Sequence, residues 1–132
     1  MEDKQIQSYC LANEIMVTSS ASGLVYVSFT EGSGDPVKNG DTLVVKYTGR
    51  FLNGQIFDSS EDGAGSVRFI IGRKEMIKGW EEGFMYMKEG GTARFVVPSR
   101  LGYGIKGFGP VPGDTPVVYD VELVKVIREG NS

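Results

Sequence analysis

The chain has 132 residues, of which 40% are hydrophobic and 23% charged, and its formal net charge is −3. This length supports one domain with a single core, and the negative balance with scattered Lys and Arg disfavours nucleic acid as a partner. Histidine is absent and Cys10 is the single cysteine, which excludes catalytic triads, internal disulfides and Cys-x-x-Cys motifs. We therefore expect neither a metal nor another cofactor.

No run approaches the roughly 18 apolar residues that a membrane-spanning helix needs, and the first residues contain no apolar segment typical of a signal peptide. The sequence therefore predicts no transmembrane segment in this chain.

The N-terminal segment differs from the rest of the chain. Four of its residues are spaced three or four positions apart, as on one face of a helix: Ile6, Tyr9, Cys10 and Asn13. This pattern predicts a short amphipathic helix over residues 4–14, with Asp3 as its N-cap. The Ser- and Thr-rich residues 18–23 are then expected to form a linker.

After this linker the apolar residues alternate, as in strands of an antiparallel sheet. Each of five groups is predicted to mark one face of a strand: Val25, Val27 and Phe29; Leu43, Val45 and Tyr47; Val67, Phe69 and Ile71; Ala93, Phe95 and Val97; and Val117, Tyr119, Val121 and Leu123. Residues 31–36 and the pair Asn53-Gly54 predict turns. The alternation slips at Leu123 and Val124, which indicates a β-bulge.

One internal segment has a helical pattern instead. Over residues 74–87, apolar side chains recur at three- and four-residue spacing, at Ile77, Trp80, Phe84 and Met87. Residues 99–116 are rich in Gly and Pro and predict a long loop before the last strand, and such loops are often functional. The fold class is therefore α+β, with a twisted antiparallel sheet of about five strands half-wrapped around one short helix.

Several short motifs together resemble the FKBP-type peptidyl-prolyl cis-trans isomerase family over residues 23–128. These motifs are Val45-Lys46-Tyr47-Thr48-Gly49, Phe57-Asp58-Ser59-Ser60, Ile77-Lys78-Gly79-Trp80-Glu81-Glu82-Gly83, Val96-Val97-Pro98, Tyr103-Gly104 and Tyr119-Asp120-Val121-Glu122-Leu123. Their order and spacing carry the resemblance, which implies the same half-wrapped fold. We expect residues 1–22 to be a helical extension with its linker and residues 23–132 to be the isomerase domain.

The resemblance also implies a site in which an aromatic pocket receives the substrate proline. Its implied catalytic residues are Trp80 at the pocket floor, Asp58 at the rim and Tyr103, whose hydroxyl would bind a substrate carbonyl. Ile77 would offer its backbone N–H to another carbonyl. The remaining implied substrate contacts are Tyr47, Phe57, Phe69, Met76, Val111 and Tyr119.

Each of these residues also has a plain structural explanation. The aromatic residues could be ordinary core residues, and Asp58 could be a turn residue whose side chain bonds its own backbone.

Two departures from the family pattern bear on the pocket. Val67 stands where many members have a further aromatic residue, and the loop after Tyr103 is about one residue shorter, which could move the position of Val111 by one. Phe108 adds an aromatic residue at the tip of this loop.

The function implied by the resemblance is isomerisation of Xaa-Pro bonds in peptides and unfolded proteins, which assists protein folding and needs no cofactor. Macrolide inhibitors are implied as further ligands. One alternative is a non-catalytic module or chaperone that binds proline peptides. Another is a barrel-like carrier of a small apolar ligand, which would leave the internal helix and Asp58 unexplained.

The N-terminal segment also resembles the lead-in of exported bacterial members, in which a helix or lipoprotein anchor precedes a Ser-Gly-Leu strand, here Ser22-Gly23-Leu24. This resemblance implies the cell envelope or periplasm, with a signal removed, and the cytoplasm is the alternative. A solvated tail is an equally good interpretation of residues 1–22.

Overall fold

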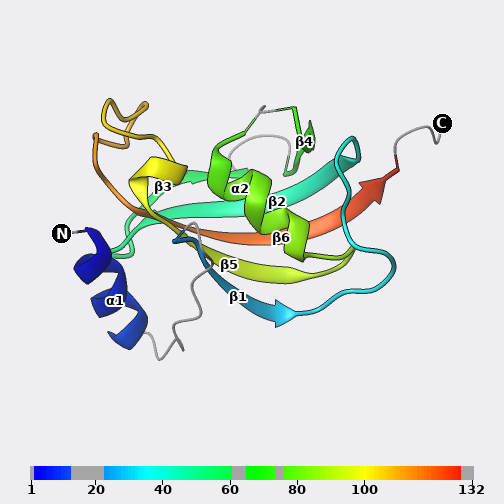
Figure 1. The fold of residues 1–132 in the computed structure, drawn as a ribbon, viewed down its shortest axis with the longest axis horizontal. Helices are drawn as coiled ribbons and strands as arrows, with labels where there is room; N and C mark the ends of the chain where they lie inside the picture. Colours follow the sequence, from blue (N-terminus) through cyan, green and yellow to red (C-terminus); the bar gives the residue numbers. More distant parts are fainter. Residues whose placement is uncertain (1, 13–22, 61–64, 74–75, 129–132) are drawn as a thin grey trace.

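A twisted antiparallel sheet forms the body of the protein, and one short helix lies across it (Figure 1). The computed structural model describes residues 2–12, 23–60, 65–73 and 76–128. The helices are α1 (Glu2–Ala12), α2 (Lys78–Gly83) and the 3-10 turns η2 (Phe84–Tyr86) and η3 (Ser99–Leu101). The strands are β1 (Val25–Thr30), β2 (Thr42–Phe51), β3 (Ile56–Ser59), β4 (Val67–Ile70), β5 (Thr92–Val97) and β6 (Val117–Ile127).

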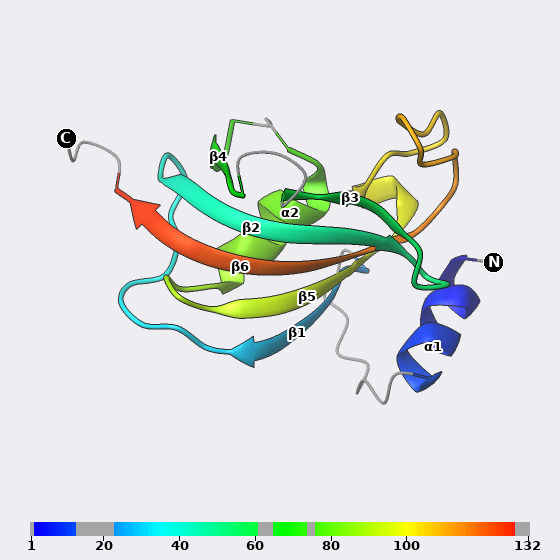
Figure 2. The ribbon, with the colours of Figure 1, turned by 180° about the vertical axis from the view of Figure 1, so that it is seen from behind.

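The sheet has the strand order β1-β5-β6-β2-β3, and β4 also pairs with β2. The last half of β2 pairs with β3, for example Thr48 with Ser59, whereas its first half pairs with β4, for example Thr42 with Ile70. Seen from behind, the sheet stands in front of α2 (Figure 2). The predicted α+β fold is confirmed, and six strands are present instead of about five because two short strands share one edge of β2.

The main core fills the space between α2 and the sheet. Alternating residues of β2, β5 and β6 face it, as the sequence predicted for the groups that contain Leu43, Phe95 and Tyr119. The helix approaches β5 closely, because a Cβ atom at Gly83 would lie 2.7 Å from Phe95 Cζ. Glycine at this position therefore lets the helix pack directly on the sheet.

The internal helix is shorter than the predicted segment 74–87. Ile77 is its N-cap, with extended backbone at φ −61° and ψ 154°, and the α-helical part ends at Gly83. The chain then tightens into η2, and Met87 is extended again. Two glycines within six residues disfavour a longer helix. Residues 74–75 lie outside the described residues.

In β1 the predicted group Val25, Val27 and Phe29 lies on the face of the sheet that is turned away from the main core. Tyr26 points to the main core, with its ring centroid 5.8 Å from that of Phe95. Val25 and Val27 instead belong to a second apolar cluster on the other face of the sheet, and Phe29 is 59% exposed. Both faces of β1 carry apolar residues, so alternation alone could not decide which face turns inward.

The second cluster is formed by α1 packing against the outer face of the sheet. Ile6 and Cys10 are buried there against Val25, Val96 and Val118. The predicted amphipathic helix is therefore present, but it begins at Glu2, so Asp3 lies inside it and is not its N-cap. The predicted helix end after Ala12 and the linker up to residue 22 lie outside the described residues.

The predicted bulge in the last strand is confirmed. Val44 pairs with Lys125 whereas Val45 pairs with Leu123, so Val124 is the extra residue. The predicted turn at Asn53-Gly54 is also present, because Gly54 N–H donates to Phe51 C=O and Gly54 has φ +93°. These two features fix the register of β2 against β6 and β3.

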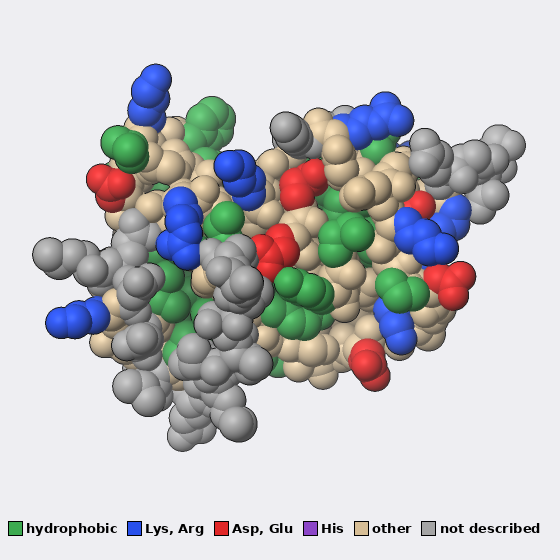
Figure 3. Space-filling view, viewed as in Figure 1, with side chains coloured by type: hydrophobic (Ala, Val, Ile, Leu, Met, Phe, Trp, Pro, Cys, Tyr) green, Lys and Arg blue, Asp and Glu red, His purple; other side chains and the backbone are tan. Residues whose placement is uncertain are grey.

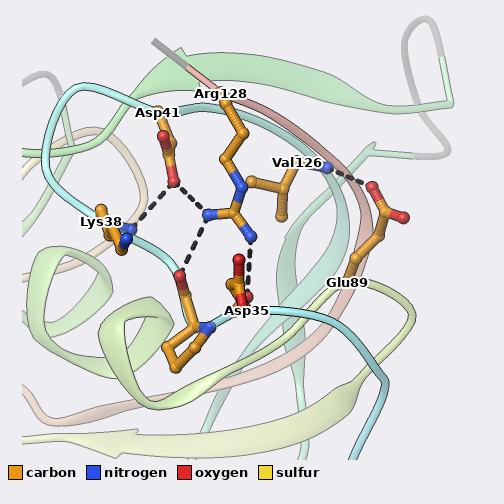
Figure 4. Close-up of polar contacts among 7 residues, drawn as sticks. Asp35, Lys38, Asp41, Glu89, Val126 and Arg128 are labelled. Carbon is orange, nitrogen blue, oxygen red and sulfur yellow. Dashed lines mark hydrogen bonds and ion pairs between the residues drawn. The ribbon is translucent and has the colours of Figure 1, made fainter.

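A polar cluster joins the end of β6 to the turn before β2 (Figure 4). The buried carboxylate of Asp41 accepts hydrogen bonds from Lys38 N–H at 2.9 Å and from Arg128 Nη1 at 2.6 Å. Arg128 also donates to the carbonyls of Pro36 at 3.0 Å and Asp35 at 2.8 Å. One guanidinium thus holds three acceptors of the turn.

Arg128→Ala is expected to lower the free energy of unfolding by about 2 kcal/mol, because it leaves a buried carboxylate without its charged partner. Urea titration followed by circular dichroism measures this loss. Arg68→Ala, which removes an exposed arginine on β4, is the matched control and should cost about 0.5 kcal/mol or less. Equal losses in the two variants would contradict a stabilising role for the cluster.

Candidate active site

A group of aromatic rings surrounds Trp80 on the face of the sheet that α2 covers. The Trp80 side chain is 2% exposed. Its ring centroid lies 5.0 Å from that of Tyr47, 5.2 Å from Tyr119, 5.4 Å from Phe84 and 5.8 Å from Phe69. Most of these rings meet edge to face, which is the favoured geometry for packed aromatic side chains. Trp80 is therefore at the centre of an aromatic cluster.

Phe57 of β3 extends this cluster. Its ring centroid lies 5.8 Å from that of Tyr119 and 6.4 Å from that of Tyr103. Glycine in β2 makes this approach possible, because a Cβ atom at Gly49 would lie 2.8 Å from Phe57 Cζ and 2.9 Å from Tyr119 Cε1. Any larger residue at position 49 would have to displace one of the two rings.

The loop between β5 and β6 supplies the remaining side of the site. Asp114 N–H donates to Gly104 C=O at 2.9 Å, and Phe108 and Val111 exchange two backbone hydrogen bonds of 2.9 Å each. Val111 is buried, whereas Phe108 is 72% exposed and stacks on Tyr103 with ring centroids 5.9 Å apart. The loop thus places one apolar residue in the core and one aromatic pair near the surface.

Six polar groups lie beside these rings. Tyr47 Oη donates a hydrogen bond of 2.8 Å to Asp58 Oδ2, and the hydroxyls of Tyr103 and Tyr119 bond each other. Within the described residues, the Ile77 N–H donates no hydrogen bond, and the buried Trp80 Nε1 has no partner. Unsatisfied donors of this kind are costly in a folded protein unless a ligand or water completes them.

The structure brings the sequence-predicted residues together. Phe69, Trp80, Val111 and Tyr119 are buried in the main core cluster, and Asp58 is joined to it through Tyr47. The other predicted residues are half-buried and packed against that cluster: Tyr47, Phe57, Met76, Ile77 and Tyr103. Phe69 and Tyr119, at 3% and 2% exposure, are as deeply buried as Trp80.

Sequence reasoning missed two residues that shape the site. Gly49 allows Phe57 and Tyr119 to approach, and Phe51 packs on Phe57 with ring centroids 5.0 Å apart. Both follow Tyr47 in β2 at two-residue intervals, so the period of the strand could have placed them on the same face.

A hollow of about 500 Å³ lies at the surface between α1, the turn after β2 and the loop before β6. Among the residues that the structure describes, its wall contains no ionisable side chain and no tyrosine hydroxyl, and consists of Gln5, Phe51, Leu52, Asn53, Gln55, Pro110, Pro112, Thr115 and Pro116. We place the candidate site at the aromatic cluster instead, because convergent polar groups beside apolar walls are typical of binding sites.

Burial raises the pKa of the Tyr103 hydroxyl; its hydrogen bond with Tyr119 acts in the opposite direction, and the charge of Asp58 raises the pKa further. Burial also raises the pKa of Tyr119, and the neighbouring Tyr103 adds to this effect. Both phenols are therefore protonated under ordinary conditions and remain hydrogen-bond donors.

These shifts predict a loss of stability at alkaline pH. The pKa values of Tyr103 and Tyr119 are higher in the folded protein than in the unfolded chain. The stability that these two protonated phenols contribute is therefore fully present below about pH 10, and it falls at higher pH because the phenols of the unfolded chain then ionise. Urea titrations at increasing pH should show this fall, with a shallower slope in Tyr119→Phe. Tyr86→Phe, which removes an exposed phenol, is the control. If stability fell as steeply with pH in Tyr119→Phe as in the wild type, the raised pKa of Tyr119 would not be the cause of the fall.

Comparison with known proteins agrees with this geometry. A family profile described as FKBP-type peptidyl-prolyl cis-trans isomerase matches residues 34–124. A probable FKBP-type peptidyl-prolyl cis-trans isomerase of Haemophilus influenzae is 40% identical over 111 residues, which are 83% of this chain and 45% of that protein. An FK506-binding protein of Neisseria meningitidis serogroup B is 42% identical over 105 residues, 79% of this chain and 96% of that protein.

Solved structures give the same result. The crystal structure of FkpA from Escherichia coli superimposes with a TM-score of 0.84 at 35% identity, covering 96% of this chain and 59% of that chain. The chain thus spans only about half the length of some of its relatives. No helix within the described residues is long and apolar enough to cross a membrane. The family resemblance of the sequence motifs is confirmed, and the chain belongs to the FKBP-type peptidyl-prolyl cis-trans isomerase family.

Proposed function

We propose that this chain catalyses cis-trans isomerisation of Xaa-Pro bonds in peptides and unfolded proteins, and thereby assists folding, with residues 23–132 as the catalytic domain. The observation that carries the proposal is the aromatic cluster around Trp80, with the hydroxyl of Tyr103 and the carboxylate of Asp58 beside it. Apolar rings fit a proline ring, and the polar groups fit the carbonyls on either side of it.

The reaction requires neither a nucleophile nor a group to be transferred. Rotation about an amide bond costs about 18–20 kcal/mol because resonance is lost, and an Xaa-Pro bond in water takes about tens to hundreds of seconds to isomerise. The twisted amide has less charge separation than the planar one. Surroundings of low polarity therefore penalise the transition state less than the ground state, which is a differential effect of the kind that catalysis requires.

Each polar group has a proposed role in holding the substrate. The Ile77 N–H, which donates no hydrogen bond within the described residues, would bind one substrate carbonyl, and the Tyr103 hydroxyl would bind another. Asp58 would orient polar groups near the rotating bond, and its carboxylate is itself held by Tyr47 Oη. Oriented dipoles of this kind are effective where little water competes.

The required energy is within the reach of such a site. A rate gain of about a thousandfold to a millionfold corresponds to about 4–8 kcal/mol of transition-state stabilisation. Low polarity and two or three oriented dipoles could together supply it.

We propose apolar segments of unfolded chains as substrates. Exposed hydrophobic side chains project from the loop between η3 and β6 (Figure 3), where Ile105 is 83% exposed and Phe108 is 72% exposed. They would contact residues next to the proline. Val67, half-buried against the core, leaves more room than an aromatic residue would, so bulky ligands such as macrolide inhibitors are further proposed occupants.

Trp80 is the only tryptophan of the chain, so its fluorescence reports directly on this site. Titration with a Leu-Pro-Phe peptide should change its emission, and a catalytic amount of the protein should accelerate refolding of a protein whose slow step is proline isomerisation. A peptide that binds without any acceleration of refolding would favour the non-catalytic module. An unchanged emission together with unchanged refolding would reject the site.

A further inference from the structure

We propose that the Tyr119 hydroxyl positions the Tyr103 hydroxyl, so that Tyr103 keeps its own proton for the substrate carbonyl. In this arrangement Tyr119 donates to Tyr103 Oη, and Tyr103 donates outward. The inference rests on the proposed function, because it assigns a specific task to a side chain behind the site.

Within the described part of the chain, the hydroxyl proton of Tyr119 has one hydrogen-bond acceptor. The residue is 2% exposed, and its ring packs against those of Trp80, Phe57 and Tyr47 at centroid distances of 5.2, 5.8 and 5.9 Å. Tyr103 Oη is its only hydrogen-bond partner among the residues that the structure describes. The nearby indole nitrogen of Trp80 can only donate, so it could not accept this proton.

The other tyrosine of the cluster does not compete for this role. Tyr47 donates its own hydroxyl proton to Asp58 Oδ2 at 2.8 Å. A buried hydroxyl group is costly when its proton has no acceptor, so we infer that the Tyr119 hydroxyl donates a hydrogen bond to Tyr103 Oη.

This bond would help Tyr103 in two ways. A hydroxyl that accepts one hydrogen bond is polarised and donates a stronger second one. Tyr103 also sits between Gly102 and Gly104 in a loop, where the backbone has unusual freedom, with Gly104 at φ +69°. Tyr119, which is fixed on β6, therefore orients the Tyr103 hydroxyl, although the Tyr103 backbone lies in a loop.

The test is a double-mutant cycle of Tyr119→Phe and Tyr103→Phe, in which kcat/KM for an Xaa-Leu-Pro-Phe peptide is measured. Tyr119→Phe alone should lower kcat/KM about threefold to tenfold, the range expected for one oriented hydrogen bond. In the Tyr103→Phe background the same change should have no further effect, within about twofold. Equal losses in both backgrounds, or no loss in either, would overturn the proposal. Tyr86→Phe, at an exposed tyrosine, is the control for removal of a phenol.

A second readout does not depend on turnover. The Tyr119 hydroxyl proton should exchange slowly with water and give a separate proton NMR signal, which disappears in Tyr119→Phe and also in Tyr103→Phe. Persistence of that signal in Tyr103→Phe would show a different acceptor and overturn the proposal. If the wild type bound the peptide without isomerising it, the proposed function would fail, whereas the signal would still test the hydroxyl pair.

Discussion

Replacement of Trp80 by alanine should destabilise the fold by about 4 kcal/mol and abolish binding of proline peptides. The side chain is 2% exposed and touches four other rings, so its removal leaves a cavity that its neighbours cannot fill. A domain of this size has about 5–15 kcal/mol of stability, so the variant should fold only marginally.

Urea titration followed by circular dichroism measures the stability, and peptide NMR measures the binding. Phe29→Ala removes a large aromatic residue that is 59% exposed and lies against Arg94 on the opposite face of the sheet, and it should leave peptide affinity unchanged. Trp80→Phe retains an apolar ring and should recover most of the stability but only part of the affinity. Unchanged peptide affinity in Trp80→Phe and in folded Trp80→Ala would show that the proline binds elsewhere.

Asp58→Ala should lower kcat/KM about tenfold to a hundredfold without destabilising the fold. Loss of one preorganised group at a buried site costs about a hundredfold to a thousandfold, and exposure to water should reduce the effect here. Asp58 is exposed, and its interaction with Tyr47 Oη has a length of 2.8 Å. Pairs of this kind contribute little to stability.

Two variants make this prediction specific. Tyr47→Phe leaves the carboxylate in place but removes its hydrogen-bond donor, so it should have a smaller effect on kcat/KM than Asp58→Ala. Glu122→Gln, which removes an exposed carboxylate of β6 outside the site, should have none. If Glu122→Gln and Asp58→Ala lowered kcat/KM equally, the effect would come from net charge and not from the position of Asp58.

The parts of the fold that could be predicted are those that a local pattern of apolar residues contains. Alternation around Phe95 and Tyr119 identified the inward faces of β5 and β6, and the slip at Val124 identified the bulge. Alternation did not show which face of β1 turns inward, because α1 covers the outer face and makes Val25 a buried residue there. Which face a second element covers is a tertiary property that a local pattern does not contain.

The candidate site divides in a similar way. The motifs identified Trp80, Asp58 and Tyr103 because the family resemblance places those residue types in that order. The hydrogen bond between Tyr103 and Tyr119 joins residues 16 positions apart on different elements, and the short contact across Gly49 depends on two rings from different strands. Such contacts depend on how the loop folds back over the sheet, and no local spacing encodes them.

The most direct test of the central claim is the cis-trans exchange of an Xaa-Leu-Pro-Phe peptide, followed by NMR exchange spectroscopy with a catalytic amount of protein. The uncatalysed bond takes about tens of seconds or longer, so the free peptide should give no exchange peaks within a one-second mixing time. We predict strong exchange peaks with the wild type and much weaker ones with Asp58→Ala. Peptide signals that shift on binding but show no exchange would contradict catalysis by this chain.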